Sequence, residues 1–549
     1  MAAVICPPLG WEAIQSYDAL RSLGDRLAAS GVHTLRLHYD GTGESAGTDR
    51  DADRWDAWVD SIEQARATLA AQPGVTDVVL VGLRMGATLA AALSERIGVA
   101  GLVLWEACPS GSFYLRELEI LASASPDGPD TQGVEPGDLV ATGHLYTAET
   151  QERLRQIDLT GSIPKDSPDV LLVARDDRPP PTRIGEHFRA AGCAVDVAHL
   201  PGHKEMMIYP ERSSPPGVIL EKIVDWVAAR GTESPAEPWY WVPAASATHG
   251  DVLRSPVRTG PGGRFGMLME PAVRRPGPTA GLLLLTGGVV PRTAVNRMYV
   301  EVGRRLAGAG WKVLRIDLAS IGESVPVGSV ARSDAYPPEM HADVRAARDA
   351  LVTATDGGPI TLMGLCSGAY AAFRSAVTDG GVARIVLLNP LLLGAWDDPV
   401  YGEEVLTAEE TRGAVVDGSR WKRLLSGQVD VAAKAREAFD QLRHRASGLA
   451  DRVGSMGGRI PDGVPSEMAV LLESGVDVQV VYSEGDRGLA VFDRTLAGSE
   501  DHLVGLGLGF TLISEADHTF NALSARNELL SFLEKHLASA EGGTGPDPE

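Results

Sequence analysis

The sequence predicts an α/β fold that occurs twice in tandem, each copy a mostly parallel sheet flanked by helices. The first observation is length, because 549 residues are too many for one hydrophobic core and indicate two domains. The second is a repeat without gaps: residues 22–45 read SLGDRLAASGVHTLRLHYDGTGES, and residues 301–324 read EVGRRLAGAGWKVLRIDLASIGES. The third is the alternation of short apolar strands with helical stretches, which is typical of a parallel sheet covered on both faces.

The repeat divides the chain into two predicted domains. We expect the first at residues 1–230 and the second at residues 251–540, joined by a linker at 231–250 and followed by a disordered tail at 541–549. The first domain is expected to begin directly at the apolar strand AAVIC. The second is expected to open with an antiparallel pair of strands, VLRSPVRTG and RFGMLMEPA.

The two domains are predicted to share the same succession of elements after the repeat. A strand, a Gly-x-x-x-Gly turn and a helix of small residues follow, as DVVLVGLRMGATLAAAL in the first domain and PITLMGLCSGAYAAFRS in the second. A later strand then ends in an acid, and a histidine follows it. These residues are Asp177 and His203 in the first domain, and Asp486 and His518 in the second.

Each domain also carries an insertion between the small-residue helix and the strand that ends in the acid. The insertions span about residues 109–165 and 391–467, and insertions at this point usually form a helical lid. The second contains two plausible amphipathic helices. Part of it is basic: residues 420–459 hold nine Lys and Arg against four Asp and Glu, in a chain of net charge −23. A basic lid would attract an acidic partner, and the alternative is a solvated helical face that happens to be basic.

The pentapeptide Gly364-Leu365-Cys366-Ser367-Gly368 has the pattern of a nucleophile elbow with cysteine at its centre. The flanking glycines are needed because the turn is strained and the strand passes close to the helix. Nucleophile, acid and histidine follow one another in the order typical of the α/β-hydrolase fold. The sequence therefore predicts two tandem domains of this fold, with a catalytic set only in the second.

The predicted catalytic set is Cys366, His518 and Asp486. His518 would deprotonate the Cys366 thiol, and Asp486 would orient the imidazole. Glu484 is the rival for the orienting acid, but Asp486 ends its strand and matches Asp177 of the first domain. The alternative for Cys366 is a small buried thiol without a catalytic role.

Backbone N–H groups near the elbow are expected to stabilise an oxyanion. One donor would be the N–H of Ser367, at the start of the following helix. The second would come from the loop Thr286-Gly287-Gly288-Val289, at Gly288 or Val289.

In the first domain Arg84 occupies the position of the nucleophile. An arginine stays protonated and cannot carry an acyl group, so this site is predicted to be vestigial even though Asp177 and His203 are retained. We expect Arg84 to form an ion pair with Asp177, with an anion-binding role for a ligand as the alternative.

Composition excludes several other classes of function. The net charge of −23 argues against nucleic-acid and anionic-membrane binding, and no stretch approaches the length of a membrane span. Four widely spaced cysteines predict reduced thiols rather than a disulfide framework or metal site. The sequence has neither a Gly-rich dinucleotide-binding turn nor a His or carboxylate cluster with metal-ligand spacing, so we expect no cofactor. The N-terminus has no basic region before an uninterrupted apolar run, so we expect a cytoplasmic protein.

The motifs resemble those of known families. GLRMGATLAA with YDGTGES resembles the exosortase-A-system-associated hydrolase 2 type, whose elbow also carries Arg. GLCSGAYAA with the Gly287-Gly288 turn resembles the companion hydrolase 1 type and cysteine hydrolases such as dienelactone hydrolase. It is also similar to cysteine-dependent aminoacyltransferases of nonribosomal peptide pathways. The resemblance implies the α/β-hydrolase fold and a cysteine nucleophile, whether the protein is a hydrolase or a transferase.

Three functions are therefore compatible with the sequence. The first is an enzyme that accepts an acyl or aminoacyl group on Cys366 and passes it to another acceptor in a biosynthetic pathway. An acidic carrier protein with a phosphopantetheine arm would be its partner, docking at basic positions such as Arg436, Arg443 and Arg445. The second is a cysteine hydrolase of an ester, lactone or thioester. The third is a docking or scaffold protein in which both sites have lapsed.

Overall fold

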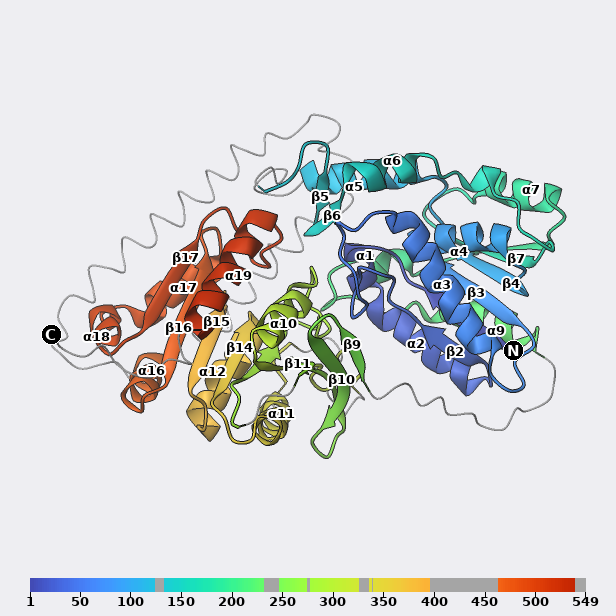
Figure 1. Ribbon diagram of the computed structural model, residues 1–549. Helices are drawn as coiled ribbons and strands as arrows, with labels where there is room; N and C mark the ends of the chain where they lie inside the picture. The colour runs from blue at the N-terminus through green and yellow to red at the C-terminus, as the bar shows by residue number, and fades with distance from the viewer. Residues whose placement is uncertain are drawn as a thin grey trace.

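The computed structural model describes residues 1–123, 133–231, 246–273, 277–324, 335–337, 339–394 and 463–538. Below, residues 1–231 are the first half and residues 246–538 are the second half. Each half contains one large sheet with helices on both faces, and the halves lie side by side (Figure 1). Most of the predicted second lid and linker and all of the predicted tail lie outside the described residues. No helix in the described ranges is both long and apolar enough to cross a membrane.

The sheet of the first half has six parallel strands in the order β2-β1-β3-β4-β7-β8. Its strand β1 is the fully buried segment AAVIC. The central strands are buried throughout because helices cover both faces of the sheet. The strands are β1 (Ala2–Cys6), β2 (His33–Arg36), β3 (Val78–Leu83), β4 (Gly101–Trp105), β7 (Asp169–Arg175) and β8 (Val195–Leu200).

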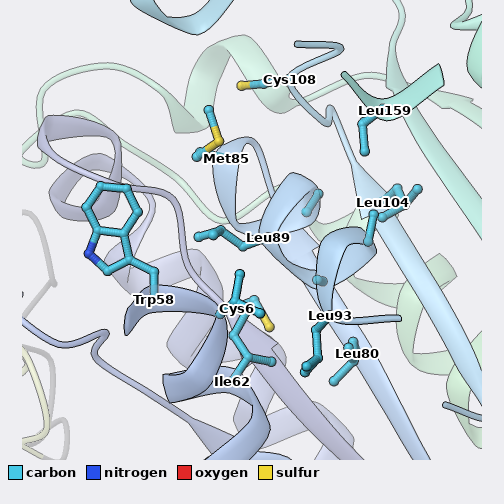
Figure 2. Close-up of a cluster of buried hydrophobic side chains, with 14 of the residues drawn as sticks. Cys6, Trp58, Ile62, Leu80, Met85, Leu89, Leu93, Leu104, Cys108 and Leu159 are labelled. Atoms are coloured by element: carbon cyan, nitrogen blue, oxygen red, sulfur yellow. The ribbon is translucent and has the colours of Figure 1, made fainter. Parts of the chain in front are cut away.

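Two layers of helices enclose this sheet. α3 and α4 pack on one face, and α2 and α9 on the other. Figure 2 shows the first of these cores, where Cys6 of β1 and Leu80 of β3 lie among side chains of α3 and α4. The helices are α1 (Trp11–Gln15), α2 (Tyr17–Ala29), α3 (Arg54–Ala70), α4 (Met85–Arg96), α7 (Thr182–Ala190), α8 (His203–Met206) and α9 (Gly217–Ala228).

The insertion of the first half, predicted at about residues 109–165, mixes helices with a small hairpin. Strands β5 and β6 pair antiparallel and pack beside α5. The elements are α5 (Gly111–Ser123), β5 (Leu139–Ala141), β6 (His144–Tyr146), α6 (Ala148–Arg155) and a short 3-10 turn at Leu159–Gly161.

The sheet of the second half has nine strands in the order β17-β16-β15-β14-β12-β13-β11-β10-β9. The six strands from β12 to β17 are parallel and repeat the order of the first sheet. The predicted antiparallel pair is present as β10 and β11. The strands are β9 (Ala247–His249), β10 (Val252–Thr259), β11 (Arg264–Pro271), β12 (Gly281–Leu285), β13 (Lys312–Ile316), β14 (Ile360–Leu365), β15 (Arg384–Leu388), β16 (Asp477–Ser483) and β17 (Gly509–Ile513).

One strand of the second sheet corrects the predicted linker. β9 lies within residues 231–250 and pairs antiparallel with β10, so the sheet starts earlier than residue 251. All three residues of β9 are exposed, and such a strand has no apolar pattern to mark it in the sequence.

The helices of the second half again form two layers. α11, α12 and α16 pack on one face of the sheet, and α10 and α19 on the other. The helices are α10 (Met298–Gly308), α11 (Met340–Ala354), α12 (Ser367–Asp379), α16 (Val464–Glu473), α17 (Arg487–Leu496), α18 (Glu500–Gly505) and α19 (Leu523–Ala538). Strand order and flanking helices give each half the α/β-hydrolase fold, as the sequence predicts.

The Gly-Glu-Ser turns of the repeat have matching hydrogen bonds in the two halves. In the first half the N–H of Glu44 donates to Nδ1 of His38, at 3.2 Å. In the second half the N–H of Glu323 donates to Oδ2 of Asp317, at 2.9 Å. His38 and Asp317 occupy the same place in the repeat, so the turn is retained although its acceptor has changed.

The glutamate of each turn forms hydrogen bonds with side chains of the other half. Glu44 accepts hydrogen bonds from both terminal nitrogens of Arg315, at 2.9 and 2.6 Å. Reciprocally, Glu323 accepts from Arg36 and from the hydroxyl of Tyr17. Arg36 and Arg315 occupy equivalent places in the repeat. The halves therefore contact each other through the same patch on each, as two subunits do in an isologous dimer.

Candidate active site

Cys366 lies in the sharp turn between β14 and α12, as predicted. Its backbone has φ 55° and ψ −116°, which is a strained conformation for a residue with a side chain. Glycine is required on both sides of it. A Cβ on Gly364 would lie 2.1 Å from the Gly368 carbonyl, and a Cβ on Gly368 would lie 2.1 Å from the Leu285 oxygen. The close packing of strand, turn and helix thus holds the cysteine in place.

Accessibility separates Cys366 from the other three cysteines. Cys6, Cys108 and Cys193 are buried, whereas Cys366 is partly exposed. Burial raises the pKa of each of the three buried thiols, which keeps them protonated at neutral pH. Only Cys366 is therefore placed to react with a substrate or a thiol reagent.

The acid and the histidine of the second half meet beyond the ends of two adjacent strands. Asp486 follows β16 and caps α17, with Oδ1 accepting the N–H of Gly488 at 2.7 Å. Its Oδ2 is hydrogen-bonded to Nδ1 of His518, which follows β17. The Asp486 side chain is only 2% exposed. Glu484 is exposed to solvent, so the structure pairs His518 with Asp486 rather than with this rival.

The electrostatics of His518 couple it to Cys366. Burial alone would lower the pKa of His518. The negative charge of Cys366 and the hydrogen bond with Asp486 outweigh burial and raise this pKa to about 10. A protonated imidazole and a thiolate at Cys366 would therefore stabilise each other. Such a pair keeps a sulfur nucleophilic at neutral pH.

Asn389 is a residue of the site that sequence reasoning missed. It follows β15, is fully buried and has a φ of 41°. Its Nδ2 donates to the backbone oxygen of His518 at 2.8 Å, and its Oδ1 accepts the N–H of Ser483 at 2.7 Å. Asn389 thus fixes the backbone that carries the imidazole. Its only signal in the sequence is an amide directly after an apolar strand.

The predicted oxyanion donors occupy two facing loops, and one of them needs correction. Ser367 is the first residue of α12, where the N–H has no acceptor within the helix. The N–H of Gly288, however, donates to the hydroxyl of Ser367 at 2.8 Å. The expectation that Gly288 offers an open donor is therefore wrong for this conformation. Val289, the other candidate, lies in the same loop with its side chain packed against the core.

In the first half, Arg84 keeps the elbow but not the predicted partner. Its φ of 55° and ψ of −123° match the strained turn at Cys366. Arg84 pairs with Glu12, through Nε at 2.8 Å, and with Glu117. Asp177 is exposed and pairs with Arg175 at 2.6 Å. The predicted Arg84–Asp177 pair is therefore wrong, because the helices α1 and α5 bring two glutamates over the elbow.

His203 remains near this vestigial site as a buried, neutral group. It lies edge-on to the Trp105 ring, with 6.3 Å between ring centres. Burial and the positive charges of Arg175 and Arg84 lower its pKa to about 3. The three residues Arg84, Asp177 and His203 thus no longer form a nucleophile, acid and base.

We expect Arg84→Ala to destabilise the protein without creating or abolishing activity. The change leaves Glu12 and Glu117 close together without their shared cation, which costs about 3 to 5 kcal/mol where such a pair is buried. Urea unfolding measures this loss. The matched control is Arg178→Ala, because Arg178 is exposed and lies 3.7 Å from Glu106. Loss of enzymatic activity in folded Arg84→Ala would instead favour a ligand-binding role for Arg84.

A cavity of about 730 Å³ lies between the halves. Its walls include Pro8 and Gly10, in the loop after β1, and Asn296 and Arg297, in the loop before α10. This volume is typical of small-molecule sites. A molecule bound there would contact both halves.

Two further predictions concern carrier docking and metal binding. The proposed docking positions Arg436, Arg443 and Arg445 lie outside the described residues. Across the ranges that are described, no three His, Cys, Asp or Glu side chains are grouped so that they could hold a metal ion.

Comparison with protein families gives one match. The model of the serine aminopeptidase S33 family matches residues 12–110. This segment includes the elbow of the first half, where this chain has Arg84 in place of a nucleophile. No curated protein matches the chain.

Comparison with solved structures gives many matches at low identity. Est1E from Butyrivibrio proteoclasticus with bound ferulic acid is 15% identical, covering 42% of this chain and 88% of its own, with a TM-score of 0.32. A dienelactone hydrolase from Anabaena variabilis is 12% identical, covering 54% and 99%, with a TM-score of 0.30. An esterase from Pyrococcus furiosus is 14% identical, covering 52% and 91%, with a TM-score of 0.32.

Proposed function

We propose that this protein is a cysteine-dependent acyl-transfer enzyme that forms a thioester on Cys366. One observation carries the proposal: a partly exposed cysteine in a nucleophile elbow adjoins a histidine that is hydrogen-bonded to a buried aspartate. His518 accepts the thiol proton, and Asp486 holds the imidazole in place. The N–H of Ser367 is the best placed oxyanion donor.

The chemistry runs through one covalent intermediate. The Cys366 sulfur attacks the carbonyl carbon of an acyl thioester, and the resulting tetrahedral adduct expels the substrate thiol, which takes the proton from His518. An acceptor thiol, amine or hydroxyl then attacks the acyl-enzyme. His518 removes the acceptor's proton, and the Cys366 thiolate leaves as the new bond is completed.

Transfer is favoured over hydrolysis by the energetics of the sulfur. An enzyme thioester is close in energy to the substrate thioester, so exchange with another thiol is reversible, and amines attack thioesters readily. The resemblance of GLCSGAYAA to cysteine-dependent aminoacyltransferases points the same way. The runner-up is a cysteine hydrolase, which differs only in that water resolves the same intermediate.

Intact mass spectrometry tests the proposal directly. After incubation with a panel of acyl thioesters, we expect a mass increase of one acyl group that maps to Cys366. Added amine or thiol acceptors should discharge it faster than water does. Rapid discharge by water alone would identify the hydrolase. A chain with neither an adduct nor preferential alkylation of Cys366 would be a docking protein, and the proposal would be wrong.

We expect an acidic carrier protein to deliver the acyl group, because the stretch 420–459 of the second insertion is basic. Charge reversal at Arg436, Arg443 and Arg445 should raise KM for a carrier-bound substrate several-fold, with little effect on a small thioester. Rising salt should reproduce the loss, since exposed charges are screened over about 8 to 10 Å. Equal KM changes for both substrates would contradict carrier docking.

A further inference from the structure

The loop between β12 and α10 is held by the first half of the chain. This loop carries Gly288, whose N–H contacts Ser367 beside the nucleophile. Near its middle, Nε of Arg292 lies 2.9 Å from Oε1 of Glu44. At its end, the Arg297 guanidinium donates to backbone oxygens of residues 41, 43, 45 and 47. Residues of the first half thus fix the loop that borders the site of the second half.

A third contact from the first half reaches still closer to the nucleophile. A Cβ on Gly288 would lie 2.5 Å from Oε1 of Glu211, so this carboxylate packs directly against the loop. A Cβ on the neighbouring Gly287 would lie 3.0 Å from Cβ of Cys366. The loop is therefore packed between the first half and the elbow, and small shifts of the loop would move it relative to the sulfur.

Glu44 is the charged anchor of this arrangement. It binds Arg315, which is fully buried, and lies against Arg292, whose side chain is 5% exposed. Burial by itself would raise the pKa of Glu44, but the two guanidinium groups outweigh it and hold the pKa well below its usual range. Glu44 is consequently ionised at neutral pH, and both arginines depend on its charge.

Arg292 transmits this anchor to the loop because its side chain and its backbone are both fixed. Its N–H donates to Oδ1 of Asp317 at 2.7 Å, and its Nη1 donates to Oδ2 at 2.7 Å. Asp317 holds Arg292 from within the second half, and Glu44 holds it from the first. The segment from Thr286 to Arg292 is thus fixed at one end by β12 and at the other by this pair of carboxylates.

We propose that Glu44 of the first half is a positioning residue, acting through Arg292, for the loop of the second half that carries Gly288 and the remaining oxyanion candidate, the N–H of Val289. The inference rests on the proposed function of Cys366. It also gives the first half a role in a reaction for which it has no nucleophile. The acylation step, in which charge develops on the carbonyl oxygen, depends on where the loop lies. Alkylation of the sulfur forms no oxyanion, so its rate does not depend on the position of the loop.

The repeat supplies a matched control. Glu323 makes the reciprocal contacts, to Arg36 and Tyr17 in the first half, and it interacts with Arg292 only through space rather than through an ion pair like that of Glu44. Glu44→Gln and Glu323→Gln each remove one partly buried charge from the same interface while keeping side-chain size. An effect on the interface alone would appear in both variants, and an effect on the loop only in Glu44→Gln.

The experiment compares two reactions of the full chain. 4-Nitrophenyl acetate acylates Cys366 and releases a coloured product, whereas iodoacetamide alkylates the same sulfur. For Glu44→Gln we expect acylation to fall about 10- to 100-fold with the alkylation rate within about two-fold of wild type. Glu323→Gln should leave both rates near wild type. Glu44→Asp, which keeps the charge but shortens its reach, tests the same point if Glu44→Gln unfolds, as thermal melting will show.

Three results would overturn the inference. Acylation could be unchanged in Glu44→Gln, acylation and alkylation could fall together, or Glu323→Gln could match Glu44→Gln. Each of these requires an active wild-type protein. A wild-type protein that is neither acylated nor preferentially alkylated at Cys366 would instead remove the proposed function itself.

Discussion

Cys366→Ala is expected to abolish acyl transfer and every covalent acyl adduct while leaving the fold intact. Turnover requires a nucleophile on the elbow, and no other cysteine is accessible to replace it. The turn itself depends on Gly364 and Gly368, whose missing side chains allow the close packing, so alanine at position 366 should not unfold it. Steady-state rates and intact mass with an acyl thioester measure the loss, and circular dichroism checks the fold.

Cys366→Ser should also be strongly impaired, because an alcohol is far less acidic than a thiol and His518 is matched to a thiolate. Cys193→Ala is the matched control, since this cysteine is buried in the first half. It should retain wild-type rates. Turnover near the wild-type level in Cys366→Ala would show that the nucleophile is misassigned.

The sequence predicted most of the second site because that site is built from local patterns. The elbow around Cys366 follows from its glycines, and Asp486 and His518 follow from their positions after apolar strands. Strand ends of a parallel sheet lie along one edge, so residues distant in sequence could be placed together. The apolar patterns of two further segments also placed the antiparallel pair β10 and β11 correctly.

The errors concern side chains whose partners come from distant segments. Arg84 was expected to pair with Asp177 by analogy with a triad, but Glu12 and Glu117 are nearer and bury the charge better. The N–H of Gly288 was expected to be free to bind an oxyanion, but it donates a hydrogen bond to the hydroxyl of Ser367. A local sequence pattern does not show which of several distant polar groups will pair with a given side chain or N–H group.

The interface between the halves was missed although its signal is present in the repeat. Two Gly-Glu-Ser turns with an arginine eight residues before each glutamate occur in both copies, at Arg36 and Glu44 and at Arg315 and Glu323. Charges at equivalent places in partly buried segments call for partners. In a tandem pair the partner is the other copy.

His518→Ala is expected to lower the rate of acyl transfer by about four to six orders of magnitude, because the thiol then has no base and no imidazolium partner. Asp486→Asn should cost one to two orders less, since it removes orientation and charge but leaves the imidazole. Glu484→Gln is the matched control, because this neighbouring carboxylate is exposed. If Glu484→Gln is the more damaging change, the acid is misassigned.

The pH dependence of Cys366 alkylation tests the same pair without a substrate. The pKa of His518 is raised to about 10, so the thiolate–imidazolium pair should persist from neutral pH until His518 loses its proton near that value. Alkylation in the wild type should therefore be fast and nearly constant between pH 7 and about 9. In His518→Ala the thiol should titrate near the ordinary cysteine pKa of about 8.5, so alkylation should be slow at pH 7 and rise through that value. A wild-type profile that rises in the same way would show that His518 does not activate Cys366, whatever its distance from the sulfur.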